Sequence, residues 1–360
     1  MQPEQGVAGV MSIYAMAFVA RKTVPVALAL ATIGMASGPV LANDTQAAVG
    51  IGGLVFERND RIVMDSEDLF LSQDQVRVRY TYRNASSQPQ TVTIAFPLPE
   101  VPVGGADWDP SEVVIPDWRE LGMKTLVDGR PVALTRIDVA RVRGRDVTAR
   151  LRQLGWPVRF WEAEEFDARL SRLSPKERKA FLAEGLVAAL GGGDDGLRPG
   201  WTVATSFVRS QTFQPGVPVT VEHSYVPSLG GSVGTMLDRE WRKEAMAGPG
   251  GYLARYCVDG DFLAGYDRKR NLPDGQPNPA LWPSEKWLSY ILSTGANWRG
   301  PIGRFHLTVD KGSATSLVSL CMDGIRKTGP TRFEVTKTQF EPRRDIDVLI
   351  VDFIKQDVSP

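Results

Sequence analysis

The stretch Gln75-Val-Arg-Val-Arg-Tyr-Thr-Tyr-Arg83 alternates strictly between apolar and polar side chains. Its apolar members are Val76, Val78, Tyr80 and Tyr82. Because successive side chains of a strand point to opposite faces, this alternation predicts a half-buried β-strand with one face toward solvent. A turn cluster follows at 84–89, and the run Thr91-Val-Thr-Ile-Ala-Phe96 then predicts the partner strand.

Short strand patterns of the same kind recur along the chain. Asp128-Gly129 lies between two short apolar segments, and this dipeptide is a strong hairpin signal. The segments 202–213 and 217–226 predict an antiparallel pair joined across Pro215-Gly216. Residues 287–294 also fit a short helix, but their alternation favours a strand. The remaining strand candidates are 304–309, 316–322, 331–339 and 346–354.

Residues 145–190 differ from their surroundings, because their apolar side chains recur at helical intervals. Ser174-Pro175-Lys176-Glu177 combines a capping box with a proline at the first helical position. The helix after it is predicted to carry one apolar stripe and to end at Gly191. The members of this stripe are Leu182, Leu186 and Leu190.

Many short strands with one helical region between them predict a mainly β protein. We therefore expect antiparallel β-sandwich domains with a helical insert at about 145–190. The predicted division is a leader at 1–42, an N-terminal β domain at 43–136, the helical insert with a glycine-rich linker at 137–196, and a C-terminal β domain at 197–360. Within the last of these, residues 227–283 are rich in glycine and proline and are predicted to be mainly loops.

The composition is that of a folded protein and excludes several classes. Of the 360 residues, 42% are hydrophobic and 23% are charged, which argues against wholesale disorder. The 42 basic and 42 acidic side chains balance, so no nucleic-acid partner is expected. Two histidines and two cysteines are too few for a Cys/His zinc site if the cysteines are joined, and we expect no cofactor.

The first 42 residues have the features of a secretory signal peptide. A basic pair at 21–22 precedes the apolar run 24–36, and Gly38-Pro39 interrupts it before small residues that suit cleavage ahead of Asn43. A transmembrane anchor is the alternative, because the apolar character continues weakly past the proline. No later apolar run reaches the roughly 18 residues that span a bilayer, so the mature chain is predicted to be periplasmic or secreted and without a transmembrane segment.

Cys257 and Cys321 are the only cysteines, and both follow the predicted leader. An even pair of cysteines in an oxidising compartment predicts a disulfide, with two buried thiols as the alternative. On the chain-entropy model, closing a loop of this length stabilises the fold by about 4 kcal/mol at most.

An acidic group at Asp65, Glu67 and Asp68 is the first candidate site. Closely spaced carboxylate oxygens suit calcium, and an exported protein meets this ion. The alternating ligand spacing and the glycine of a calcium loop are missing, however. A solvated turn is therefore the simpler interpretation of this group.

The loop residues Asn297, Trp298 and Arg299 are the second candidate site, for binding. They lie in a short loop between Gly295 and Gly303, and an aromatic residue beside an arginine is typical of binding hot spots. The alternative is that Trp298 folds back and plugs the end of a sandwich. The two interpretations differ in whether the indole is exposed.

The two histidines complete the search for catalytic groups. His223 shares its predicted strand face with apolar side chains and is expected in the core or at its margin, whereas His306 is expected on a wet face. Neither has a nucleophile next to it in the sequence, and neither a Gly-x-Ser-x-Gly elbow nor a His-Glu-x-x-His motif is present. No catalytic residue is therefore assigned.

Several segments carry a family resemblance. The most specific are Gly53-Leu-Val-Phe56, Asp65-Ser-Glu-Asp-Leu-Phe-Leu71, Ala95-Phe-Pro-Leu-Pro99, Val221-Glu-His-Ser-Tyr225, Arg255-Tyr-Cys-Val258 and Gly295-Ala-Asn-Trp-Arg-Gly-Pro-Ile302. Together they resemble a bacterial exported family catalogued as domain of unknown function 4424, over essentially the whole mature chain. The resemblance implies a secreted or periplasmic protein and brings no activity with it.

A weaker likeness covers about a quarter of the chain. Its pieces are Tyr82-Arg-Asn-Ala-Ser86, 95–99 and Val127-Asp-Gly-Arg-Pro-Val132. Their order is similar to the amino-terminal domain of inter-alpha-trypsin-inhibitor-type proteins, a β module associated with protein interaction. The helical insert departs from that pattern.

These observations favour a non-catalytic binding or interaction protein of the bacterial cell envelope, with a protein or an envelope glycan as its partner. The alternative is an envelope hydrolase that uses paired carboxylates, because two acidic side chains need no sequence motif to meet in space. Two carboxylates facing each other in a cleft would favour the enzyme. An aromatic patch on a loop rim would favour the binding protein.

Overall fold

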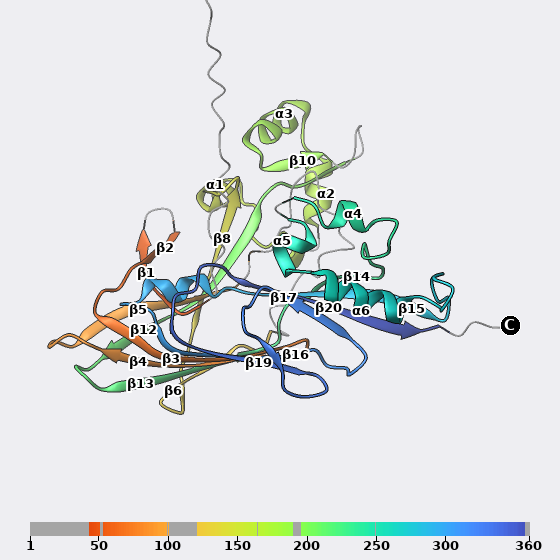
Figure 1. Cartoon of the computed structure of the whole chain (residues 1–360). Helices are drawn as coiled ribbons and strands as arrows, with labels where there is room; N and C mark the ends of the chain where they lie inside the picture. The colour runs from red at the N-terminus through yellow and green to blue at the C-terminus, as the bar shows by residue number, and fades with distance from the viewer. Residues whose placement is uncertain are drawn as a thin grey trace, which may run out of the picture. The chain divides into compact units, whose positions relative to one another are not determined.

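The computed structural model describes residues 43–50, 53–98, 100, 121–163, 165–189, 196–248 and 250–356. The predicted leader at 1–42 and residues 191–195 of the predicted linker lie outside the described residues. The fold is mainly β, as predicted, and its named strands pair antiparallel except where β3 (Ile62–Ser72) lies parallel to β16 (Ile302–Asp310) (Figure 1). Within the described residues, none of the helices combines the length and the apolar character that spanning a bilayer requires.

The largest sheet has eight strands in the order β18-β19-β16-β3-β4-β13-β6-β7. Its other members are β4 (Val76–Asn84), β6 (Lys124–Val127), β7 (Arg130–Pro131), β13 (Pro218–Tyr225), β18 (Arg326–Lys327) and β19 (Arg332–Phe340). Strands from both predicted β domains therefore share this sheet. The domain boundaries predicted at 136 and 196 are not tested by this arrangement and stay predictions.

Two further sheets complete the core. A six-stranded sheet has the order β2-β1-β5-β12-β8-β9, and a four-stranded sheet has the order β14-β15-β20-β17. Their strands are β1 (Thr45–Gly50), β2 (Gly53–Glu57), β5 (Gln90–Pro97), β8 (Thr135–Val142), β9 (Arg145–Asp146), β12 (Thr202–Phe213), β14 (Gly230–Ser232), β15 (Leu281–Tyr290), β17 (Leu317–Leu320) and β20 (Ile346–Lys355). The short strands β10 (Val187–Ala189) and β11 (Leu197–Pro199) pair separately.

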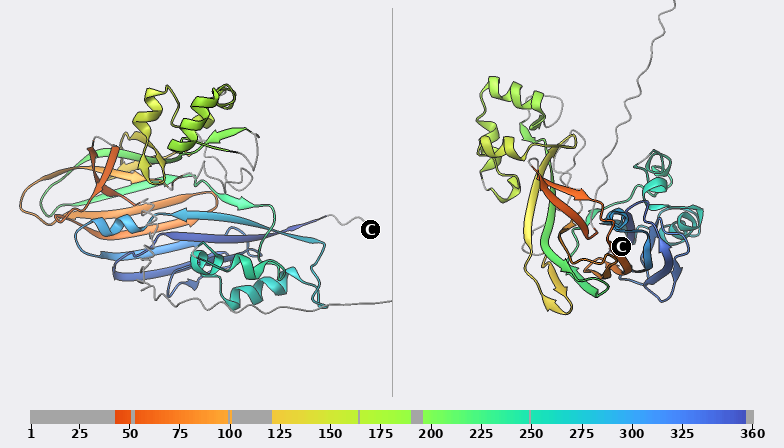
Figure 2. Two further views of the ribbon diagram at one scale, coloured as in Figure 1. Left: turned by 90° about the horizontal axis from the view of Figure 1, so that it is seen from above. Right: turned by 90° about the vertical axis from the view of Figure 1, so that its left-hand side faces the viewer.

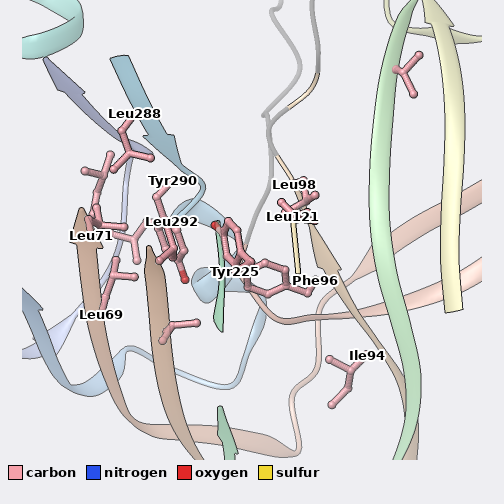
Figure 3. Packing of buried hydrophobic residues seen from close by; sticks show 14 of the residues in the cluster. Leu69, Leu71, Ile94, Phe96, Leu98, Leu121, Tyr225, Leu288, Tyr290 and Leu292 are labelled. Atoms are coloured by element: carbon pink, nitrogen blue, oxygen red, sulfur yellow. The ribbon is translucent and has the colours of Figure 1, made fainter. Parts of the chain in front are cut away.

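The inner face of the eight-stranded sheet packs against both smaller sheets, which is a sandwich arrangement. Toward the six-stranded sheet, the ring centroids of Tyr225 and Phe96 lie 5.8 Å apart. Toward the four-stranded sheet, the hydroxyls of Tyr80 and Tyr290 lie 2.9 Å apart. Figure 3 shows these layers meeting, with leucines of β3 and β15 on one side and aromatic rings beside them.

Two predicted hairpins are wrong, because their turns pass from one sheet to another. β4 pairs with β3 and β13 instead of β5, and β12 pairs with β5 and β8 instead of β13. Buried Asn84 accounts for both corners: its Nδ2 donates to the carbonyls of Gln88 and Phe213, and its carbonyl accepts from the Gly216 amide. These bonds satisfy backbone groups that would otherwise require ladder pairing.

The Asp128-Gly129 hairpin between β6 and β7 is confirmed. Both residues have positive φ values, 48° and 75°, as the turn that best fits the strand twist requires. The strand predicted at 287–294 is confirmed as far as Tyr290, where β15 ends. A short 3₁₀ helix, η2 (Ser293–Asn297), follows it.

The predicted helical insert is present. It contains α1 (Thr148–Gln153), the 3₁₀ helix η1 (Phe160–Glu162), α2 (Phe166–Ser171) and α3 (Pro175–Glu184). Ser174 and Glu177 form the predicted capping box. The predicted continuation to Gly191 is wrong: Gly185 adopts a left-handed φ of 75° and ends α3. Leu186 therefore leaves the helix and enters the core as part of the connection to β10.

The prediction of loops at 227–283 is wrong in part, because the segment holds three helices. They are α4 (Arg242–Ala245), α5 (Tyr252–Tyr256) and α6 (Gly260–Arg270). Asp259 caps α6 by accepting a hydrogen bond from the Phe262 amide, and three basic residues end it, which are ordinary helix signals that the glycines obscured. α5 lies beside β17 and β20 and α6 lies beside β17, and Figure 2 shows these helices away from the helical insert.

Candidate functional site

A β-bulge in β3 brings a carboxylate into the core. The pairing of β3 with β4 shifts between Met64 and Ser66. The buried side chains are Ile62 and Met64 before the bulge and Glu67, Leu69 and Leu71 after it. Because side chains alternate along a strand, the one-residue shift turns the odd-numbered positions inward, and Glu67 is carried with the leucines.

The predicted acidic group is thereby divided. Asp65 is held by Arg83, whose Nε and Nη2 donate to its two oxygens at 2.9 and 2.7 Å. Glu67 is fully enclosed, whereas Asp68 lies at the surface, 3.3 Å from His306 Nδ1. The three residues belong to a strand, so the solvated-turn interpretation is wrong. No group of three metal-binding side chains is found in the described part of the chain, and the geometry gives no support to a calcium site here.

Two buried carboxyl groups, those of Asp44 and Glu67, lie at the centre of a cluster of polar side chains in the core. Asp44 has the following contacts. Its Oδ1 lies 3.0 Å from His223 Nε2, and its Oδ2 accepts from Arg209 Nη2 at 3.2 Å. The other ring nitrogen of His223 lies 2.7 Å from Thr125 Oγ1. His223 is therefore a core histidine, as the strand pattern predicted. Burial alone would raise the pKa of Asp44, but the charges of His223 and Arg209 outweigh it and hold that pKa below its ordinary value.

Glu67 is the second buried carboxyl group of this cluster. Its Oε2 accepts from Asn43 Nδ2 at 3.0 Å, and its Oε1 accepts from the Tyr290 hydroxyl at 3.4 Å. Burial raises the pKa of Glu67 to about 8, against the lowering effect of these two hydrogen bonds. We name the set of Asn43, Asp44, Glu67, Arg209 and His223 the polar centre.

The polar centre does not have the geometry of an exposed catalytic dyad. Asp44 and Glu67 are 1% and 0% exposed. A hydrolytic carboxylate pair must face a substrate from opposite sides of an open cleft. The enclosed position of these two side chains therefore gives the hydrolase alternative no support.

The loop that carries Trp298 closes over the same region. Trp298 is 1% exposed, its Nε1 donates to the Asp44 carbonyl at 2.7 Å, and its ring centroid lies 5.0 Å from that of Tyr82. Asn297 Nδ2 donates to Thr45 Oγ1 at 3.0 Å, and Arg299 is exposed. The geometry supports the plug interpretation, because a buried indole cannot act as a contact for a partner.

A surface cleft of about 880 Å³ lies beside the disulfide that joins Cys257 and Cys321. We name it the disulfide cleft. Apolar side chains line part of it, including Phe262, Leu320, Met322, Phe333 and Phe340. Its basic residues are Arg268, Lys311, Lys327, Lys337, Arg343 and Arg344, and its acidic residues are Asp259, Asp261, Asp323, Glu341 and Asp345.

Two of the acidic groups in the cleft form hydrogen bonds with backbone amides of the protein. Asp259 caps α6, and Asp345 accepts from the amides of Leu292 and Ser293 at 3.1 and 3.0 Å. In contrast, no salt bridge within the described residues involves Arg268, Lys327 or Arg343 of the same cleft. The cleft therefore combines an apolar lining with basic groups that form no salt bridge within the described residues.

Lys311 adds a buried cation to the wall of the cleft. The residue is 4% exposed, and its Nζ donates to the carbonyls of Ala314 and Ser316. Burial lowers the pKa of Lys311, and the nearby charges of Lys327 and Lys269 lower it further. The charge of Asp352 acts in the opposite direction but does not cancel these effects.

The predicted disulfide is present, and it supplies a stability test. Reducing it in the chain from Asn43 onward should lower the free energy of unfolding by about 3 kcal/mol, because the reduced chain regains the freedom of a long loop. Urea denaturation with and without dithiothreitol measures this loss. A Cys257→Ser/Cys321→Ser variant is the control, because its stability should not respond to the reductant. Equal midpoints for oxidised and reduced wild type would contradict the expectation.

Two solved structures show distant similarity to this chain. A Legionella pneumophila protein, provisionally described as nutrient binding, is 13% identical, with a TM-score of 0.42; the match covers 86% of this chain and 70% of that one. An M1 zinc metallopeptidase from Deinococcus radiodurans is 8% identical, with a TM-score of 0.26; the match covers 82% of this chain and 43% of that one. Neither similarity bears on what this chain binds.

The sequence comparisons address the family. A search of curated proteins returned no match. None of the comparisons supports the weaker likeness to inter-alpha-trypsin-inhibitor-type proteins, which stays a prediction. The model of domain of unknown function 4424 matches residues 42–349, and the chain therefore belongs to that family, as its motifs predicted.

Proposed function

We propose that this chain is an exported, non-catalytic binding protein whose disulfide cleft takes an organic anion with an apolar part. The observation that carries the proposal is the combination, in one cleft, of apolar side chains with basic groups that form no salt bridge within the described residues. The secretory features of residues 1–42 and the disulfide support export, because disulfides persist in oxidising compartments.

The size and chemistry of the cleft suit a small ligand or a short segment of a larger one. Its volume lies within the range of about 300–1,000 Å³ that is usual for ligand pockets. Phe333 and Phe340 offer apolar contact, while Arg268 and Lys327 offer charge. An acidic side chain of a protein and the acid group of an envelope glycan both fit this description, so both partner classes predicted from the sequence remain proposals.

A matched pair of fluorescent probes tests the proposal. 8-Anilinonaphthalene-1-sulfonate carries an anionic group, and N-phenyl-1-naphthylamine has the same apolar rings without it. We expect the first to bind more tightly, and Arg268→Glu/Lys327→Glu to weaken its binding about tenfold, because two favourable charges become unfavourable. Binding of the neutral probe should change less than about twofold in the same variant.

The control for this experiment reverses two basic residues of the same types elsewhere. Arg172→Glu/Lys179→Glu changes the net charge by the same amount on exposed positions of the helical insert. It should leave the affinity for both probes unchanged. An equal effect of the two double variants would mean that overall charge, and not the disulfide cleft, attracts the anion, and the proposed site would be wrong.

A further inference from the structure

The first described residues of the chain are built into the core. Asn43, Asp44 and Thr45 are 0%, 1% and 0% exposed. The backbone nitrogen of Asn43 donates to Thr294 Oγ1 at 2.7 Å, and the same hydroxyl donates back to the Asn43 carbonyl at 2.9 Å. The position at which the sequence predicts cleavage is therefore followed at once by a buried and hydrogen-bonded residue.

The polar centre has too few cations for its carboxylates. Among the described residues of the polar centre, Arg209 is the one permanently charged cation, and it forms an ion pair with Asp44. Glu67 accepts only from neutral donors, the amide of Asn43 and the hydroxyl of Tyr290. A buried carboxylate without a cation is costly, and burial accordingly raises the pKa of Glu67 to about 8.

We propose that cleavage between Ala42 and Asn43 completes the polar centre, because it converts the buried amide nitrogen of Asn43 into an α-ammonium group that pairs with Glu67. Water adds across the peptide bond, so that Ala42 leaves with a carboxylate and Asn43 keeps an amine, which takes up a proton. The inference rests on the cleaved leader of the proposed function and is independent of the disulfide cleft.

The contacts of Asn43 place the new charge well. Asn43 already contacts Glu67 through its side-chain Nδ2, 3.0 Å from Oε2, so cleavage creates the new charge on a residue that touches this carboxyl group. An ammonium group has three donors, of which one is used by Thr294. Asn43 Oδ1 is buried and has no hydrogen-bond partner, so a further acceptor is available beside the new group. After cleavage, Asp44 is paired with Arg209 and Glu67 has the α-ammonium group of Asn43 as its cation.

The test compares two chains that differ by one residue at the start. One begins at Asn43 and the other at Ala42, and both are released from an amino-terminal fusion partner by a protease that leaves no extra residue. The chain from Asn43 should melt about 5 °C higher, because only its α-ammonium group reaches Glu67. The difference should disappear when both chains carry Glu67→Gln. It should persist when both carry Glu240→Gln, which changes an exposed position.

The pH dependence separates an ion pair from simple packing. Asp44 and the hydroxyls of Tyr80, Tyr82 and Tyr290 are the titratable groups that surround Glu67. Without a cation, the raised pKa of about 8 means that the folded chain holds a proton which the unfolded chain releases above its ordinary pKa, so stability should fall as the pH rises from about 5 to about 8. The chain from Ala42 should show this fall, and the chain from Asn43 should show much less of it.

Acylation supplies a measurement that compares the same two chains without any side-chain substitution. In the folded chain from Asn43, the α-amine should react with an N-hydroxysuccinimide ester roughly tenfold more slowly than the α-amine of the chain from Ala42, because burial protects it. Equal reactivity, equal melting temperatures, or a difference that survives Glu67→Gln would overturn the ion pair. Mass spectrometry of the chain recovered from envelope fractions tests cleavage separately: an intact leader would overturn the export proposal, and a start other than Asn43 would overturn this inference alone.

Discussion

Trp298→Ala should lower the free energy of unfolding by about 4 kcal/mol. The indole is fully enclosed, its ring packs at 5.0 Å from that of Tyr82, and its Nε1 is the donor to the Asp44 carbonyl. Truncation leaves a large cavity and, beside it, a carbonyl without its donor. Urea denaturation followed by circular dichroism measures the change, and the slope of the transition should stay constant.

Two further variants separate the contributions of volume and hydrogen bonding. Trp298→Phe keeps most of the ring without the donor and should cost about 1–2 kcal/mol. Trp241→Ala removes an indole that is 47% exposed and should change stability by less than about 0.5 kcal/mol. If Trp298→Ala unfolded at the wild-type urea concentration and yet lost binding of a partner, the plug interpretation would be wrong and the loop at 297–299 would be the binding site.

The class of the fold was predictable because it depends on local alternation. Val76 to Tyr82 alternate without interruption, and the strand is found where the pattern places it. The pairing of strands was not predictable in the same way. Whether a turn closes a hairpin or crosses to another sheet depends here on one buried amide, Asn84, whose partners Gln88 and Phe213 are set by the tertiary fold.

The end of α3 shows a different limit. Leu182, Leu186 and Leu190 have helical spacing, but Gly185 lies within the stripe and takes the left-handed conformation. A Cβ at Gly185 would lie 2.7 Å from Val142 Cγ1 of β8, so a residue with a side chain would clash at the point where the helix ends. The spacing of the leucines in the sequence could not predict this contact between Gly185 and Val142.

The sequence carried a signal for the polar centre that strand periodicity alone does not reveal. The buried positions of β3 change from even to odd numbers between Met64 and Leu69, and this change is visible in the sequence as a break in the apolar period. It marks a bulge and turns Glu67 inward. The disulfide cleft had no comparable signal, because its lining residues come from segments far apart in the chain, such as Arg268, Lys327 and Arg343.

Asp44→Asn should lower the free energy of unfolding by about 3 kcal/mol at neutral pH. The substitution keeps the shape of the side chain and removes the only acidic partner of Arg209 in the described structure, whose charge then stays buried without compensation. The folded pKa of Asp44 lies below its unfolded value, so its contribution is present above the unfolded pKa and is lost as the pH falls through the folded pKa. The variant should therefore lose less stability on acidification than the wild type does.

A double-mutant cycle decides whether the loss comes from the unpaired buried charge of Arg209 or from packing. Arg209→Met removes the stranded charge, so the double variant Asp44→Asn/Arg209→Met should be more stable than the sum of the two single changes predicts, by about 1–3 kcal/mol. Asp74→Asn is the matched control at an exposed position and should change stability by less than about 0.5 kcal/mol. Strict additivity in the cycle would mean that Asp44 and Arg209 do not stabilise each other, and the account of the polar centre as an arrangement of compensated charges would be wrong.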